Sequence, residues 1–312
     1  MQSDQVSKKV IILVGPTAVG KTELAIRLAE ILDGEIVSAD SRLLYRGMDI
    51  GTAKPTIEER ARAPHHLIDL ANPDQNWSLA EYQKLTLQTI QEIQDRHRLP
   101  IVAGGTGQYI RSLMEGWTIP AMQPNPRIRK VLEDWGNTIG PAELYAKMAL
   151  LDPAAAEKID PTNLRRTIRA LEVIFGTGEL FSKQKEKQPP DLDFKMIGLS
   201  RPRDELYARV DARIDAMFNQ GFVAEVKKLL DAGYAADLPT LSAIGYREVI
   251  QFLHGEISLE DARVLMRRKT REFIRRQANW FKPDDSSIEW YGMTPDPLEK
   301  MLISINEWRQ GN

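Results

Sequence analysis

The chain has no cysteine and only four histidines among its 312 residues. Without cysteine it cannot form disulfides, thiolate zinc sites or a cysteine nucleophile. His65, His66 and His254 have no carboxylate or cysteine partners at metal-ligand spacing, so we interpret them as structural. No apolar run approaches the roughly 20 residues that cross a bilayer, and the polar N-terminal stretch has no signal-peptide pattern. These absences are typical of a cytoplasmic enzyme.

The chain also lacks a net positive charge, because 42 basic residues face 44 acidic ones and the formal net charge is −2. This balance does not by itself predict a protein that binds nucleic acid. One stretch departs from it. Residues 263–276 contain one acid, Glu272, and seven basic residues, namely Arg263, Arg267, Arg268, Lys269, Arg271, Arg275 and Arg276. This local asymmetry is a first indication of a basic surface.

Short apolar strands alternate with helices in the first part of the chain. The expected strands are residues 10–14, 35–39, 66–70 and 101–103, and the expected helices are 21–32, 78–96 and one that ends near 114. Ser78 and Glu81 have the spacing of a capping box at the start of the second helix. This alternation predicts an α/β fold with a parallel sheet.

The alternation of short strands and helices stops near Pro120, where residues 119–126 contain three prolines. We predict a helical insertion over residues 121–195, and a core formed by residues 1–120 and 196–312. A strand over 195–199 resumes the sheet pattern. The C-terminal region is then expected to be helical over 203–219, 223–232, 245–254 and 258–280.

A phosphate-binding loop follows the first strand. Its residues, Gly15, Pro16, Thr17, Ala18, Val19, Gly20, Lys21 and Thr22, match G-x-x-x-x-G-K-[ST] without exception. Backbone N–H groups and the positive end of the next helix can surround phosphate oxygens. Lys21 adds a point charge, and the Thr22 hydroxyl can hold Mg²⁺. The motif predicts a P-loop NTPase-like core with a diphosphate or triphosphate site, but it does not say which molecule carries the phosphates.

Six further stretches resemble the signature of the bacterial tRNA dimethylallyltransferase family. They are residues 38–55, 65–69, 104–109, 169–173, 245–246 and 276–281, which occur in the family's order over nearly the whole chain. Two positions depart from the family pattern. Gln108 stands where a leucine is usual, and residues 163–166 vary from the usual Asp-x-x-Arg spacing. Both departures concern fit rather than chemistry.

The resemblance implies transfer of a dimethylallyl group from dimethylallyl diphosphate to the N6 amine of the adenosine that follows a tRNA anticodon. It implies that Asp40 accepts the proton of that amine, which is a poor nucleophile, and that Lys21 and Thr106 lie near the diphosphate. By the residues alone, Asp40 is as well explained by a helix cap or a Mg²⁺ site, and Thr106 by a helix cap. Arg209 and Arg213 share a helix face and by resemblance close over the diphosphate; a solvated face is an equal alternative.

The resemblance also implies contacts with tRNA, some of them from the insertion. They come from Asp40, Ser41, Arg42, Leu43, Thr106, Arg165, Arg166, Thr167, Ile168, Arg169, Leu241, Ser242, Ala243, Ile244, Gly245, Tyr246, Arg275, Arg276, Gln277, Ala278, Asn279, Trp280, Phe281 and Lys282. Periodicity puts Arg165 and Arg169 on one helix face and a buried stripe on the other, formed by Leu164, Ile168, Leu171 and Phe175. Trp280 and Phe281 offer stacking surface for RNA bases, although by composition alone they fit a core better.

Three alternatives remain open at this stage. A small-molecule P-loop kinase would use ATP and would need no basic helix. A relative that prenylates free adenylate would lack an RNA-sized basic surface. An RNA-binding module with a vestigial loop would have no use for intact Lys21, Thr22, Asp40 and Thr106. We expect a monomer.

Overall fold

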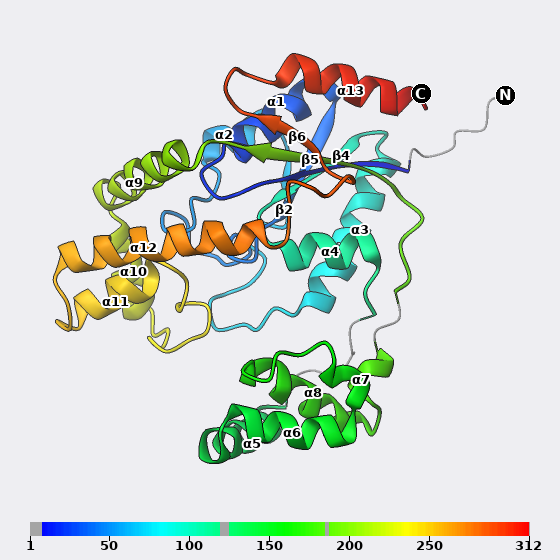
Figure 1. Ribbon diagram of the computed structural model, residues 1–312. Coiled ribbons are helices and arrows are strands. Elements are labelled where there is room, and N and C mark those ends of the chain that lie inside the picture. The colour runs from blue at the N-terminus through cyan, green and yellow to red at the C-terminus, as the bar shows by residue number, and fades with distance from the viewer. Residues whose placement is uncertain (1–7, 119–124, 185–186, 312) are drawn as a thin grey trace. The chain divides into compact units, whose positions relative to one another are not determined.

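The computed structural model describes residues 8–118, 125–184 and 187–311 (Figure 1). The chain divides into two compact units: a core unit of Met1–Met114 and Asp191–Asn312, and an insertion unit of Glu115–Pro190. The predicted insertion, 121–195, therefore begins and ends about five residues too late. Its last residues, 193–195, belong to a strand of the core unit.

The core unit is built on one parallel sheet in the order β3-β2-β4-β1-β5-β6. The strands are β1 Lys9–Val14, β2 Gly34–Ala39, β3 His65–His66, β4 Leu99–Gly104, β5 Asp193–Ser200 and β6 Glu289–Gly292. From Val10 to Val14, β1 is completely buried, as expected for a central strand covered on both faces. The predicted α/β fold is confirmed.

The third strand is shorter than the predicted 66–70. It ends at His66 because Leu67 and Asp69 have positive φ angles of 60° and 57°, which a strand cannot contain. The N–H group of Asp69 instead donates to the carbonyl of Leu43. The chain thus leaves the sheet and packs against the segment that follows β2.

The helices of the core unit agree with the predicted ones in most places. They are α1 Lys21–Leu32, α2 Ile57–Arg62, α3 Leu79–Asp95, α4 Gly107–Glu115, α9 Arg203–Asn219, α10 Phe222–Asp231, α11 Tyr246–Leu253, α12 Leu259–Ala278 and α13 Leu298–Gln310. The capping box of Ser78 and Glu81 is present at the start of α3. Helices α2 and α13 were not predicted. α2 buries no residue and so has no apolar period to detect.

The insertion unit is a small helical bundle with its own core. It contains α5 Pro126–Ile139, α6 Pro141–Leu151, α7 Pro153–Ala156, α8 Leu164–Thr177 and the 3₁₀ turn Phe181–Gln184. Ile168 and Leu171 of α8 belong to this core, whereas Phe175 is 53% exposed. The expected stripe is therefore wrong at Phe175, which lies in the last turn of the helix beyond the packed residues. Among the described residues, no helix is long and apolar enough to span a membrane.

Candidate active site

The phosphate-binding loop connects β1 to α1 and depends on two glycines with positive φ, 146° at Gly15 and 117° at Gly20. At Gly15 a Cβ would lie 2.7 Å from the carbonyl oxygen of Leu199, so a side chain would push the loop off the sheet. Lys21 begins α1, and its ammonium donates to the carbonyls of Gly15 (2.9 Å) and Pro16 (2.8 Å). The lysine is thus held over the loop.

Burial lowers the pKa of Lys21 to about 8, although the nearby carboxylate of Asp40 counteracts part of this effect. Arg213 lowers the pKa further by repulsion. An ammonium in such a place has little hydration of its own. A phosphate oxygen would therefore be an effective partner for it.

Asp40 and Thr106 lie beside each other because β2 and β4 are neighbouring parallel strands and both end here. The N–H group of Ser41 donates to the Thr106 hydroxyl (3.2 Å), and the N–H group of Thr106 donates to the carbonyl of Ala39 (3.2 Å). Asp40 accepts a hydrogen bond from the N–H group of Arg42 (2.8 Å) and does not cap a helix. The close approach requires Gly104, where a Cβ would lie 2.2 Å from the Ala39 carbonyl oxygen.

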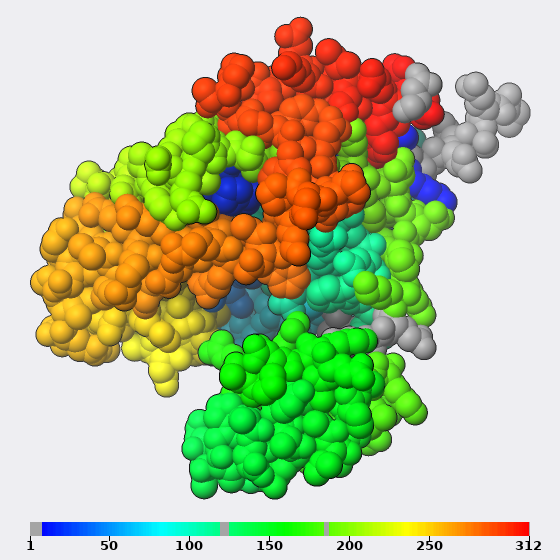
Figure 2. All heavy atoms as spheres, viewed as in Figure 1, coloured from blue at the N-terminus to red at the C-terminus, as the bar shows by residue number. Residues whose placement is uncertain are grey.

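Lys21 and Asp40 line one cavity of about 360 Å³ in the core unit. Its lining includes the polar residues Lys21, Thr22, Asp40, Arg209 and Arg213 and the apolar residues Ile36, Leu43 and Ile68. Arg209 donates to the Ala18 carbonyl (2.8 Å), which ties α9 to the phosphate-binding loop. Figure 2 shows atoms of the first part of the chain, in blue, within a hollow between α9 and α12. The cavity combines a cationic phosphate site, an available carboxylate and an apolar surface.

Comparison with known proteins assigns this arrangement to a family. The model of the IPP transferase family matches residues 43–284, which is more than half of the chain. The chain belongs to the IPP transferase family.

Relatives support this membership over almost the full length. A tRNA dimethylallyltransferase of Roseiflexus sp. is 51% identical over 298 residues, covering 96% of this chain and 98% of the relative. A tRNA isopentenylpyrophosphate transferase structure from Bacillus halodurans is 39% identical, with a TM-score of 0.71 and coverage of 98% and 96%. A eukaryotic dimethylallyltransferase described as acting on tRNA has a TM-score of 0.82 at 26% identity, with coverage of 98% and 80%.

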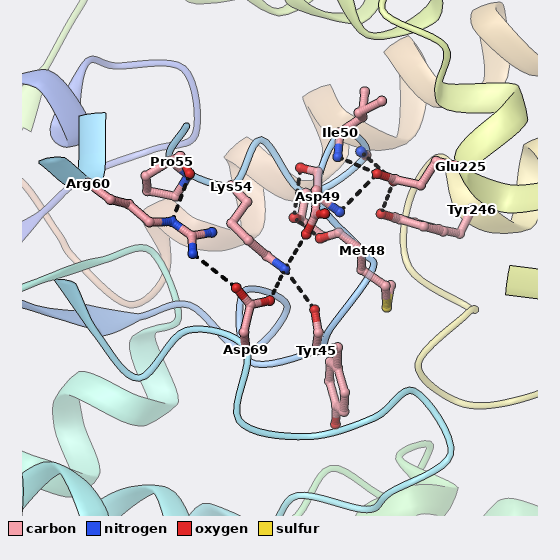
Figure 3. A network of polar contacts seen from close by, with 12 residues as sticks. Tyr45, Met48, Asp49, Ile50, Lys54, Pro55, Arg60, Asp69, Glu225 and Tyr246 are labelled. Atoms are coloured by element: carbon pink, nitrogen blue, oxygen red, sulfur yellow. Dashed lines mark hydrogen bonds and ion pairs between the residues drawn. The ribbon is translucent and has the colours of Figure 1, made fainter. Parts of the chain in front are cut away.

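One wall of the cavity in this IPP transferase family member is held by a polar network (Figure 3). The buried ammonium of Lys54 contacts Asp49 (2.5 Å) and Asp69 (2.6 Å), and it donates to the carbonyl of Tyr45 (2.8 Å). Burial tends to raise the pKa of Asp69, but hydrogen bonds from Lys54 and Arg60 outweigh it and hold the pKa below its usual value. Asp69 is therefore committed to this wall.

Glu225 of α10 anchors the same wall from the other side. Its carboxylate accepts hydrogen bonds from the N–H groups of Asp49 (3.0 Å), Ile50 (2.7 Å) and Gly51 (3.1 Å) and from the Tyr246 hydroxyl (2.7 Å). A Cβ at Gly51 would lie 2.2 Å from the Phe222 ring. Sequence reasoning missed Glu225, because its partners are mostly backbone groups some 175 residues away.

The segment 241–246, expected to contact tRNA, follows Thr240, which meets the segment 40–43 near the cavity. Arg42 donates to the carbonyl of Thr240 (3.2 Å), which joins the two. Ser242 is exposed and Ile244 is half-buried, but Leu241, Ala243, Gly245 and Tyr246 are buried. The side chains of Leu241 and Tyr246 are core residues that support this surface.

Helix α12 uses about half of its basic residues inside the core unit. Arg267 pairs with Asp215 (2.5 Å) and Arg271 with Asp211 (2.6 Å), both on α9, while Lys269 pairs with Glu248 (2.6 Å). The exposed residues near its end are Arg268, Arg275, Arg276, Ala278, Asn279 and Lys282, together with part of Trp280. Phe281 is 3% exposed, so the expectation that it offers stacking surface is wrong; its apolar ring joins the core.

In α8, the helix of the insertion unit that is predicted to contact RNA, some of the expected residues are exposed and others are buried. Arg165 and Arg166 are exposed, whereas Thr167 and Ile168 are buried in the unit's own packing. Arg169 pairs with the fully buried carboxylate of Glu172 (2.9 Å). Thr167 is 0% exposed and Ile168 4%, so the expectation that they contact RNA is wrong; both are packed inside the unit.

Within the described ranges, no group of three or more histidine and acidic side chains is arranged to hold a metal ion. The ring of His66 donates from Nε2 to the carboxylate of Glu35 (2.6 Å) and joins β3 to β2. Thr22 and Asp40 line the same cavity as Lys21. Mg²⁺ on a diphosphate keeps several waters and uses few protein ligands, so the Thr22 hydroxyl fits such an ion.

Proposed function

We propose that this chain is a tRNA dimethylallyltransferase, which moves a dimethylallyl group from dimethylallyl diphosphate to N6 of the adenosine 3′-adjacent to a tRNA anticodon. The observation that carries the proposal is the placement of Lys21 and Asp40 in one cavity, with Thr106 hydrogen-bonded to Ser41 beside Asp40. Membership of the IPP transferase family and the names of the relatives support it.

The donor's diphosphate binds at the phosphate-binding loop. Loop N–H groups, the N-terminus of α1 and Lys21 stabilise the negative charge that grows on the leaving oxygen. Arg209, held against the loop at Ala18, and Arg213 add positive charge. Thr22 would hold Mg²⁺, which would supply further charge neutralisation on the diphosphate when bound. The isoprenoid chain occupies the apolar part of the lining.

The acceptor amine attacks carbon 1 of the donor. A bond forms between that carbon and N6, the bond from that carbon to oxygen breaks, and diphosphate leaves with the electron pair. Asp40 accepts the proton that N6 loses, which raises the nucleophilicity of an amine conjugated with the ring. The 2.8 Å hydrogen bond from Arg42 orients the carboxylate while leaving its other oxygen available.

A stacked base cannot reach this cavity, so the adenosine must be turned out of the anticodon loop. The exposed residues Arg275, Arg276 and Lys282 and the exposed edge of Trp280 suit unstacked RNA. Arg165 and Arg166 of the insertion unit bind RNA phosphates elsewhere on the same substrate. We further infer that the protein acts as a monomer in the cytoplasm, where its substrate is found.

One assay tests the proposal against its rivals. The protein is incubated with radiolabelled dimethylallyl diphosphate and either an anticodon stem-loop or free AMP, and kcat/KM is compared. We expect transfer to the stem-loop and little or none to AMP, because AMP makes few of the phosphate contacts. Comparable efficiency on both substrates would favour a free-adenylate prenyltransferase. Stoichiometric ATP hydrolysis coupled to product would favour a kinase.

A further inference from the structure

Gln277, in the last turn of α12, is buried between two loops of the active site. Its side chain is 4% exposed. Its amide oxygen accepts a hydrogen bond from the N–H group of Thr17 in the phosphate-binding loop (2.9 Å). Its amide nitrogen donates to the carbonyl of Gly105, in the turn after β4 (3.1 Å). One side chain therefore bridges two backbone segments far apart in sequence.

The steric environment shows that this bridge is closely fitted. A Cβ at Gly105 would lie 2.3 Å from the amide nitrogen of Gln277, so the approach requires glycine there. Two residues on, a Cβ at Gly107 would lie 2.2 Å from the Trp280 ring. Arg111 of α4 pairs with Asp285 (2.7 Å) just beyond α12. The end of α12 is thus seated on the turn that joins β4 to α4.

The bridge continues to the carboxylate proposed as the base. Gly105 precedes Thr106, whose hydroxyl accepts from the N–H group of Ser41, next to Asp40. Covalent and hydrogen bonds therefore connect the loop that binds diphosphate, through Gln277, to the turn that holds Asp40. A primary amide serves both partners at once, because the Thr17 N–H group needs an acceptor and the Gly105 carbonyl needs a donor.

We propose that Gln277 is a positioning residue for prenyl transfer. It fixes the distance between the phosphate-binding loop and the Asp40–Thr106 pair, and it makes no direct contact with RNA. The proposal rests on the proposed function and replaces the RNA contact expected for Gln277. A distance set by two hydrogen bonds matters for reaction rate, because small misplacements of reacting groups are costly.

The test compares Gln277→Leu and Gln277→Glu with the exposed control Glu272→Gln on the same helix. For each variant we would measure the single-turnover transfer rate at saturating stem-loop, the stem-loop Kd at two salt concentrations, the Kd of inorganic diphosphate, and Tm. Gln277→Leu should slow transfer about 10-fold or more, since it removes two hydrogen bonds that orient reacting groups. It should weaken diphosphate binding severalfold and leave the RNA Kd and its salt slope near wild type. Gln277→Glu keeps the acceptor for Thr17 but places a negative charge against the Gly105 carbonyl and beside the loop, so it should also slow transfer and weaken diphosphate binding.

Two results would overturn the proposal: a folded Gln277→Leu protein with a transfer rate within about twofold of wild type, or one that loses RNA affinity but retains its rate at saturating RNA. If Gln277→Leu does not fold, Gln277→Glu carries the same comparison. A wild-type protein that binds diphosphate but transfers nothing would refute the proposed function instead. Gln277 would then be judged on diphosphate affinity alone.

Discussion

Replacement of Asp40 by asparagine separates proton acceptance from loop structure. Asparagine retains an acceptor oxygen for the N–H group of Arg42, and the bond from Ser41 to Thr106 does not involve the side chain at position 40. The fold around the site should therefore persist. Since the amide cannot take a proton, we expect the single-turnover transfer rate to fall by about 10²-fold or more.

The same substitution should also act on Lys21. The carboxylate of Asp40 supports the ammonium of Lys21, whose pKa burial lowers to about 8. Without this charge the pKa of Lys21 falls further, so the ammonium is lost at a lower pH. In the wild-type protein, kcat/KM for the donor should decline as pH rises through the pKa of Lys21. In Asp40→Asn this decline should begin at a lower pH.

The two effects can be distinguished by measuring rate and donor affinity across pH. At about pH 6, Lys21 remains charged in both proteins, so diphosphate affinity should be similar while the transfer rate differs. Filter binding should show near wild-type affinity for the stem-loop. Retention of most of the transfer rate in Asp40→Asn at this pH would remove Asp40 from the mechanism and refute the reasoning.

Three other predictions concern charge and anchoring. Arg275→Ala should weaken stem-loop binding and lower the log–log salt slope by about one, whereas Glu272→Gln should not; unchanged slopes in titrations at several salt concentrations would place RNA elsewhere. Glu225→Gln should destabilise the protein by about 1–2 kcal/mol in urea unfolding, because it puts an amide before three N–H donors; a stability equal to wild type would show that the anchor is dispensable. Chelation of Mg²⁺ should abolish transfer in the radiolabel assay, and full activity in excess chelator would exclude the ion.

Local patterns were enough to predict the parallel sheet, apart from its sixth strand, β6, and the phosphate-binding loop. The loop motif lies within eight consecutive residues. The alternation of strands and helices predicts parallel strands, whose carboxyl ends lie at the same edge of the sheet as this loop. Resemblance added Asp40 and Thr106, which the structure brings together through Ser41. Their adjacency depends on β2 pairing with β4, which is a property of the sheet order.

The errors arose where a side chain's role depends on a distant partner. Gln277 and Phe281 lie in a stretch whose sequence predicts an exposed, basic surface. Gln277 instead bridges two loops, and Phe281 is a core residue. Helical periodicity identifies a face but not what packs against it. β6, with four half-exposed or exposed residues, has too weak a pattern to identify. Glu225 accepts hydrogen bonds from backbone N–H groups, which every residue except proline has, so no sequence pattern indicates these partners.

Helix α9 has two chemically opposite sides. Arg209 and Arg213 line the cavity, while Asp211 and Asp215, offset by two residues and thus about 200° around the helix, bind arginines of α12. The helix thereby separates the arginines that line the cavity from the arginines of α12. Arginine binds both a diphosphate and the phosphates of RNA. Because Asp211 and Asp215 pair with Arg271 and Arg267, these two arginines are not available for such binding. Exchange of these acids for neutral residues would leave Arg267 and Arg271 without their ion-pair partners on α9.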